Sequence, residues 1–191
     1  MNRARTAHAW MALRASYSQL RVDVPRRRRF NPPTMNVPDA LLANLLDVWP
    51  VAHLSSVTPR GRPHTVPIVF CRDGVAIFSP IDGKTKNGRP LQREANIISN
   101  PRVAVLLDEY SSDWASLWWV RLDAQATIYN PGAEHSARLR TLLNAKYPQY
   151  AAPDLLPDHP TYLRISWNRA SGWAQEDLAT SLGRAVASDN P

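Results

Sequence analysis

Two lysines lie two residues apart in a polar stretch of the chain, and their spacing suits them to bind an anion. Lys84 and Lys86 flank Thr85. In an extended loop, residues two apart face the same way, so both ammonium groups and the hydroxyl can contact one ligand. Arg89 and Arg93 follow closely and can add charge. The pattern predicts a phosphate or carboxylate site, and the alternative is an ordinary solvated lysine loop.

A second candidate site is the apolar strand predicted from Gly61 to Phe70. Val66 and Ile68 are β-formers, and Pro67 lies between them. Proline has no amide hydrogen, so it cannot donate to a strand ladder at that point. The segment is therefore an edge strand, a bulge, or backbone left open to a ligand.

Other catalytic patterns are not evident. The histidines lack metal-ligand spacing with cysteines or carboxylates, so no metal site is predicted. They are His8, His53, His64, His135 and His159. Neither a glycine-rich dinucleotide fingerprint nor a P-loop is present. Asp108 and Glu109 are adjacent on a predicted strand, so they point to opposite faces and cannot act together.

The elements that must position these residues are mostly strands. The predicted strands are 51–57, 61–70, 75–79, 102–110, 114–129 and 162–167. The predicted helices are 36–49, a helix that begins at Pro90, and 134–147. Short turns join the first three strands, which predicts a meander with Arg72-Asp73-Gly74 as a hairpin turn. About six antiparallel strands and three helices predict a mainly β fold, a small closed barrel with helices at its rim.

Composition and charge place the chain among compact cytosolic proteins. Its 191 residues fit one domain with an attachment, and 44% of them are hydrophobic. No apolar run reaches the length of a membrane span. Cys71 is the only cysteine, so no internal disulfide can form, and a reducing cytoplasm is the expected compartment.

The net charge of +7 comes entirely from the first segment. Residues 1–34 contain eight arginines and one acid, whereas residues 35–191 contain 15 basic and 15 acidic residues. A balanced body does not favour a nucleic-acid partner. The extension is interpreted as a targeting peptide, a basic arm that contacts nucleic acid or anionic lipid, a disordered tail, or a translation artefact upstream of a true start at Met35. We expect a domain over 35–176 and a frayed tail over 177–191, which shows no core pattern.

Several motifs, taken in order, resemble those of one known family. They are Thr58-Pro-Arg-Gly-Arg-Pro-His-Thr-Val-Pro, Asp82-Gly-Lys-Thr-Lys, Asn96-Ile, Asn100-Pro-Arg-Val, Asp113-Trp, Leu117-Trp-Trp-Val-Arg, Lys146-Tyr-Pro-Gln-Tyr and Gly172-Trp. The run from Val51 to Trp173 resembles the flavin- and deazaflavin-binding split-barrel proteins, which are similar to pyridoxamine 5'-phosphate oxidase. Within that family it is most similar to the actinobacterial branch that depends on coenzyme F420.

The resemblance implies an FMN-binding type of split β-barrel that forms a homodimer with two cofactor sites across its interface. Thr65, Val66, Pro67 and Ile68 would lie along the tricyclic ring. Ser79, Lys84, Thr85 and Lys86 would hold the phosphate, with Arg93 nearby. Trp173 of one subunit would approach the site of the other. The arginine-bearing phosphate motif of the pyridoxamine-phosphate oxidases themselves is not evident, so that substrate is not expected.

Two classes of function follow from the resemblance. The first is an F420-dependent oxidoreductase that transfers a hydride to a small unsaturated or quinone-like molecule. The second is an FMN-binding relative or a non-catalytic protein that carries the cofactor. The cofactor would carry the hydride, and the protein would supply orientation and dry packing. His64 and Tyr110 are both candidates for the proton donor.

Overall fold

The computed structural model describes residues 34–81, 91–152 and 155–188. Within them, eight strands form one antiparallel sheet, accompanied by four α-helices. The strands are β1 (Met35–Asn36), β2 (Ala52–Val57), β3 (Pro63–Ile68), β4 (Cys71–Asp73), β5 (Ala76–Ile81), β6 (Arg102–Glu109), β7 (Trp118–Tyr129) and β8 (Thr161–Ala174). The helices are α2 (Asp39–Val48), α3 (Gln92–Ser99), α4 (Ala133–Lys146) and α5 (Leu178–Ser188), with short 3-10 turns at Trp114–Ser116 and Pro148–Ala151.

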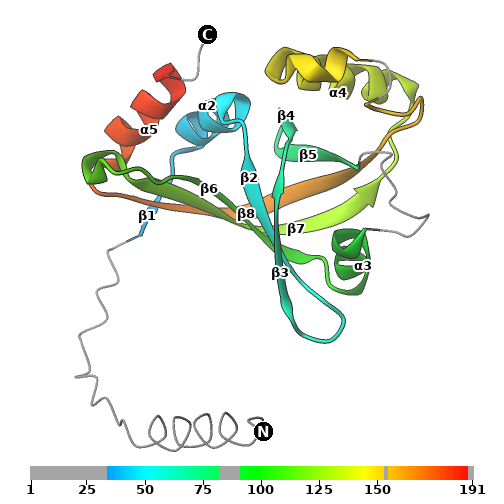
Figure 1. The fold of residues 1–191 in the computed structure, drawn as a ribbon, viewed down its shortest axis with the longest axis horizontal. Coiled ribbons are helices and arrows are strands. Elements are labelled where there is room, and N and C mark those ends of the chain that lie inside the picture. Colours follow the sequence, from blue (N-terminus) through cyan, green and yellow to red (C-terminus); the bar gives the residue numbers. More distant parts are fainter. Residues whose placement is uncertain (1–33, 82–90, 153–154, 189–191) are drawn as a thin grey trace, which may run out of the picture. The chain divides into compact units, whose positions relative to one another are not determined.

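The order of the strands closes the sheet into a barrel. The order is β3-β2-β6-β7-β8-β5-β4, and β1 pairs with the end of β8. Its two ends, β3 and β4, are consecutive in the chain and are separated only by Val69 and Phe70. The sheet therefore curls until the chain itself joins its ends (Figure 1). This confirms the predicted mainly β fold with flanking helices.

Alternation of side chains along the strands builds the core. In β7, alternate residues are buried, namely Trp118, Val120, Leu122, Ala124 and Ala126, while the residues between them are exposed or half-buried. A period of two directs alternate side chains to opposite faces of a sheet. The buried set forms the main core inside the barrel, and the other set leaves a solvent-facing outer surface on β6, β7 and β8.

The helices cover different parts of the barrel. Helix α2 contributes a buried stripe of Leu42, Leu45 and Leu46, and α5 lies beside it (Figure 1). Helix α4 lies over the hairpin of β4 and β5, where Leu139 and Leu143 form a second, smaller core. Helix α3 contacts β2 and β7. In the described part of the chain, no helix is both long and apolar enough to cross a membrane.

Two expectations from the sequence were wrong. The first three strands do not form a meander, because β5 pairs with β8 and the Arg72-Asp73-Gly74 turn joins β4 to β5 instead. The stretch after Asp177 is not a frayed tail. Leu178–Ser188 form α5, and Leu178 and Leu182 are buried in the main core. Residues 1–33 lie outside the described residues, so the separate N-terminal extension stays a prediction.

Candidate functional site

Four of the predicted cofactor residues lie on β3, which is an edge strand. Thr65 and Pro67 are exposed, Val66 is half-buried and Ile68 is buried. β3 lies at one end of the sheet order, so β2 is the only strand paired with it among the described residues. An edge strand of this kind tolerates proline, because the missing N–H can face away from the partner strand.

The hydrogen-bond register determines which backbone groups of β3 face the open edge. The Thr58 N–H donates to the Arg62 carbonyl oxygen over 2.9 Å at the end of the β2–β3 hairpin. Inter-strand bonds alternate along an antiparallel pair, so the odd-numbered residues of β3 turn their backbone groups away from β2. Of these, Pro63 and Pro67 have no N–H. Thr65 therefore carries the one N–H that β3 directs toward its open edge.

A network of polar side chains lies on the inner side, between α3 and β2. The Asn96 Nδ2 donates to Ser56 Oγ over 2.9 Å, and Gln92 Nε2 donates to Asn96 Oδ1 over 2.8 Å. Ser56 Oγ in turn donates to the His64 carbonyl oxygen over 3.4 Å. Asn96 is fully buried. These bonds fix α3 against the β2–β3 hairpin, because a buried amide must find hydrogen-bond partners.

Two buried nitrogens beside this network have no hydrogen-bond partner within the described residues. They are Nε of Arg93 on α3 and Nδ1 of His64 on β3. An unsatisfied buried polar atom is costly, and an arginine N–H binds anionic oxygens well. The predicted phosphate residue Arg93 thus has donor capacity to spare, which fits a cofactor with a phosphate group.

The other predicted phosphate residues are either outside the described residues or buried in the barrel. Lys84, Thr85 and Lys86 lie outside the described residues. Ser79 lies on β5 opposite Leu163 and is 2% exposed. It shares its face with the core residue Ile77, so its side chain points into the barrel, whereas Thr65 and Pro67 are exposed. The described structure therefore does not bring Ser79 to the same face as those two residues.

Trp173 lies in an aromatic groove on the outer face of the sheet. It is paired with Trp119 on β7, and both rings line a cavity of about 350 Å³ together with Leu106 and Tyr110. Asp108 lines the same cavity, and its Oδ1 lies 3.3 Å from His53 Nδ1. The groove combines flat apolar rings with one acid and one base, Arg121, which suits a flat, partly polar ligand.

A family model described as pyridoxamine 5'-phosphate oxidase matches residues 41–171, well over half of the chain. The chain belongs to the pyridoxamine 5'-phosphate oxidase family. The matched range runs from α2 to the far half of β8, so it includes all of β3 and α3 and most of the barrel core, whereas the core residues of α5 lie beyond it. No curated protein sequence matches the chain.

Solved structures with the same fold are distant in sequence. A conserved hypothetical protein of Mycobacterium tuberculosis is 19% identical with a TM-score of 0.57, and the match covers 77% of this chain and 88% of that one. A FAD-binding protein of Mesorhizobium loti is 17% identical with a TM-score of 0.53, covering 73% and 95%. The heme storage protein HutZ of Vibrio cholerae is 14% identical with a TM-score of 0.53, covering 73% and 95%. At such identities these structures establish the fold alone.

In this member of the family, the two candidate proton donors lie in different places. Tyr110 is 82% exposed and lines the aromatic groove, whereas the Nδ1 of His64 is buried on the inner side of β3. Burial raises the pKa of the Cys71 thiol to about 12, which keeps it protonated and unreactive. Among the described residues, no cluster of three metal-ligating side chains occurs.

Sequence reasoning missed the residues that accompany Trp173. The outer face of β6 and β7 carries Leu106, Asp108 and Trp119. Along each strand these residues alternate with buried ones, so they point away from the core. The period-two pattern of the two predicted strands could have placed all three on one surface. What the pattern could not provide is the pairing of β7 with β8, which brings Trp119 beside Trp173.

Proposed function

We propose that this protein is an F420-dependent oxidoreductase that transfers a hydride between the deazaflavin and a small unsaturated or quinone-like substrate. Its family makes a flavin-type cofactor the first expectation. The motifs that it shares with the F420-dependent branch, above all Asp82-Gly-Lys-Thr-Lys, support the deazaflavin over FMN. The cofactor would supply the hydride carrier, while the chain binds it, orients it and excludes water.

The observation that carries this proposal is the open edge of β3. Thr65 offers an N–H there, and the carbonyl oxygens of Pro63 and Thr65, which flank this N–H, face the same side. A donor between acceptors is the pattern that the amide-like edge of a flavin or deazaflavin ring can pair with. A rigid strand holds these groups in place, so binding them costs little conformational entropy.

The anionic end of the cofactor would lie toward α3. The Nε of Arg93 has no hydrogen-bond partner among the described residues, and Lys84 and Lys86 precede the helix in the chain. Charge-assisted contacts of this kind set affinity rather than hydride chemistry, because the phosphate is remote from the reacting carbon. Replacing both lysines by alanine should therefore raise the apparent cofactor constant and leave turnover at saturation almost unchanged.

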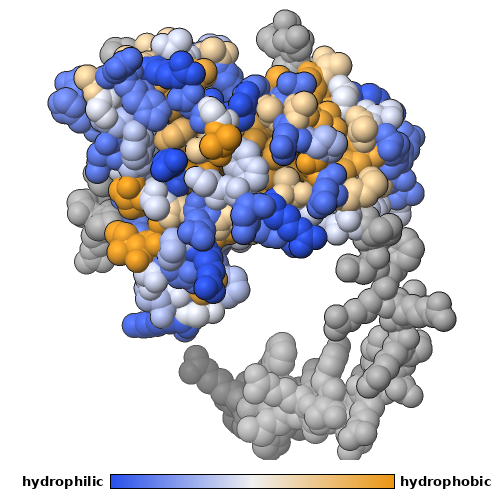
Figure 2. All heavy atoms as spheres, turned by 180° about the vertical axis from the view of Figure 1, so that it is seen from behind, coloured by the Kyte–Doolittle hydropathy of each residue, from blue (hydrophilic) through white to orange (hydrophobic). Residues whose placement is uncertain are grey.

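The working assembly in this proposal is a homodimer in the cytoplasm. Trp119 and Trp173 line an outer groove that a second subunit could cover, which would place Trp173 near the other subunit's site. Figure 2 shows the largest hydrophobic area of its view on the side of the barrel that carries α2 and α5. Self-complementary contacts of this type build most two-fold dimers. Light scattering that finds a monomer at micromolar concentration would contradict the assembly.

A titration followed by ultraviolet-visible spectra tests the proposed function. We expect F420 to bind with a shift of its absorbance, and reduced F420 to be oxidised when a quinone such as menadione is added. FMN, FAD and heme are titrated in parallel. Tight binding of FMN or FAD with no binding of F420 would reject the deazaflavin and keep the family's flavin chemistry.

The second candidate is a binding protein that does not catalyse. It is favoured by the variety of ligands among proteins of similar structure, which include a FAD-binding protein and a heme storage protein. Binding of one of these cofactors without any turnover across a substrate panel would support it. Turnover of bound cofactor at more than the rate in buffer would exclude it.

A further inference from the structure

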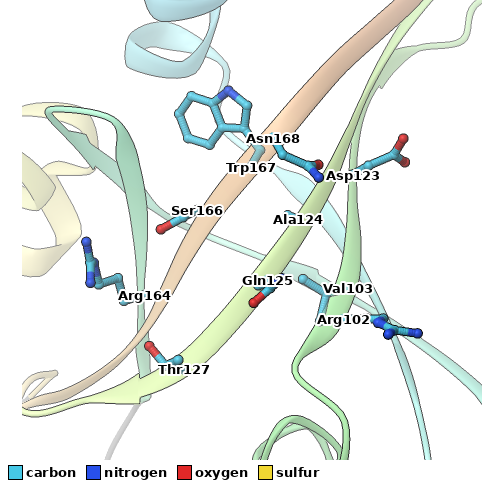
Figure 3. A pocket seen from close by; sticks show the side chains of 10 residues that line it. All are labelled: Arg102, Val103, Asp123, Ala124, Gln125, Thr127, Arg164, Ser166, Trp167 and Asn168. Atoms are coloured by element: carbon cyan, nitrogen blue, oxygen red, sulfur yellow. The ribbon is translucent and has the colours of Figure 1, made fainter.

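A second groove lies on the outer face of β6, β7 and β8, away from the residues assigned to the cofactor. Its cavity measures about 510 Å³. Figure 3 shows its side chains on the three neighbouring strands, with Arg102 and Arg164 on opposite sides and small polar side chains between them. The polar residues that line it are Arg102, Asp123, Gln125, Thr127, Arg164, Ser166 and Asn168.

The strand register aligns these side chains in two rows. Arg102 pairs with Gln125, and Gln125 pairs with Ser166, so one row crosses all three strands. Thr127 pairs with Arg164 in the next row on the same face. Arg164 lies two strands away from Arg102 and two residues further along the strand direction. These two displacements place the Cα atoms of the two arginines roughly 12 Å apart.

The two arginines carry charge that nothing nearby neutralises. In the described part of the chain, neither Arg102 nor Arg164 has an ion-pair partner, and both are exposed. The one acid that lines the cavity, Asp123, is already paired with Nε of Arg121 at 3.1 Å. The groove therefore has two positive ends and a floor of amide and hydroxyl groups.

The backbone shapes the groove. The pairing of β7 with β8 shifts register between Asp123 and Ala124, and Asn168 is the extra residue on β8. A bulge bends its strand and redirects side chains, and bulges of this kind recur beside binding sites. Trp167 lines the cavity next to the bulge and gives it an apolar wall.

We propose that this groove binds an elongated small molecule with at least two anionic groups, such as a polyphosphate or a tricarboxylate. Each guanidinium takes one anionic group, and Gln125, Ser166 and Thr127 bind polar atoms between them. Arginine suits this role because its planar donors match phosphate and carboxylate oxygens in pairs. The groove uses none of the cofactor candidates, so its ligand and the cofactor do not compete for the same side chains.

Isothermal titration at low salt tests the groove with three probes: tripolyphosphate, citrate and acetate. We expect tripolyphosphate or citrate to bind, acetate to show no measurable binding, and 0.5 M NaCl to weaken the interaction strongly. Which of the two polyanions binds more tightly distinguishes a phosphate from a carboxylate ligand. The indole N–H resonance of Trp167 should shift during the titration, which places the ligand in this groove.

Single replacements Arg102→Gln and Arg164→Gln should each weaken binding about tenfold, and the double variant should abolish it. Arg184→Gln is the matched control, because it removes the same charge from an exposed position on α5 and should bind like the wild type. Melting temperatures would be measured to check that all variants are folded. Absence of binding to either polyanion, or binding by the double variant within twofold of the wild type, would overturn the proposal.

Discussion

β3 and β4 are the two halves of one extended segment, and they differ in how their backbone groups are satisfied. β3 pairs on one side with β2, and its other edge offers the N–H of Thr65 to a ligand. β4 pairs with β5 and is covered by α4. The two halves meet at Val69 and Phe70, where the barrel closes.

Side chains at the C-terminal end of α4 contact the junction and hold it and the β4 half in place. Tyr147 Oη accepts the Phe70 N–H at 3.1 Å and can donate to the Pro50 carbonyl oxygen at 2.9 Å or the Phe70 carbonyl oxygen at 3.0 Å. Burial raises the pKa of this hydroxyl to about 12, so it remains a donor. Lys146 Nζ lies 3.6 Å from the centre of the Phe70 ring.

The difference shows that one strand can serve two purposes within a few residues. Where a side chain forms hydrogen bonds with backbone groups that no strand pairs, the backbone is fixed, and removing that side chain costs stability. Where the open edge is left to solvent, the backbone is available to a ligand. We therefore expect substitutions in the first half to affect binding and substitutions at the junction to affect folding.

The largest effect is expected for Val66→Pro. Val66 directs its N–H toward β2, because it alternates with Thr65 and Pro67, and its side chain packs against the core. A proline there removes a ladder bond and inserts a ring between paired strands, at a cost of about 3 kcal/mol. Urea unfolding would measure it. A loss below 1 kcal/mol would mean that the register of β3 is assigned incorrectly.

Tyr147→Phe is expected to cost about 1–3 kcal/mol, because it leaves the buried Phe70 N–H without a partner. The matched control is Tyr162→Phe. The hydroxyl of Tyr162 is buried with no hydrogen-bond partner among the described residues, so its removal should be neutral or stabilising. Equal losses in the two variants would show that Tyr147 does not stabilise the barrel junction. Cofactor affinity should not change in either variant.

The sequence predicted the β half of the fold well because its signals are local. Alternation in 118–129 and the apolar runs at 102–109 and 76–81 each fit one strand. The pairing of β5 with β8 rather than β3 depends on contacts between residues 80 or more positions apart, which local patterns do not encode. Helix α5 was missed because its stripe of Leu178, Leu182 and Ala185 is short and separated by polar residues.

The candidate site was predictable in part for the same reason. The unusual proline at position 67 predicted an edge strand, a bulge or backbone open to a ligand, and β3 is an edge strand. The role of Pro63 became visible only with the hydrogen-bond register, which shows that both prolines face the open side. Arg93 was placed near an anion on charge alone, and only coordinates could show that its Nε lacks a hydrogen-bond partner within the part of the chain that the structure describes.

Thr65→Pro should leave the fold intact and weaken cofactor binding about tenfold. The new ring occupies the same side of β3 as Pro63 and Pro67, so no ladder bond is lost, but the one N–H on the open edge disappears. Thr65→Val is the control, because it removes the hydroxyl that contacts Ser55 and keeps the N–H. Titration of F420, or of whichever flavin binds the wild type, gives the affinities. Equal affinity of Thr65→Pro and the wild type would exclude this N–H as a ligand contact.

The smallest effect is expected at the end of β4, where Asp73 joins the hairpin to α4. Asp73 accepts hydrogen bonds from Arg138 at 2.8 Å and 3.0 Å and contacts His135 Nε2 at 3.1 Å. The Arg138 hydrogen bonds are the main cause that lowers the pKa of Asp73, and His135 adds to them. A carboxylate whose pKa is lowered in the folded state stabilises the fold above its ordinary value, about 3.9, and loses that contribution as the pH falls toward the folded value.

Asp73→Asn should therefore reduce stability at pH 7 by about 1 kcal/mol or less, because Arg138 is largely exposed. The difference from the wild type should shrink as the pH is lowered from 5 to 3, since the wild-type carboxylate is then protonated as well. Melting temperatures across this range measure it, with the exposed Asp158→Asn as a control that should match the wild type throughout. A difference that stays constant with pH would show that Asp73 acts through packing of the hairpin and not through its charge. The hydroxyl of Tyr147 would then be the main polar contact between the end of α4 and the segment that contains β4.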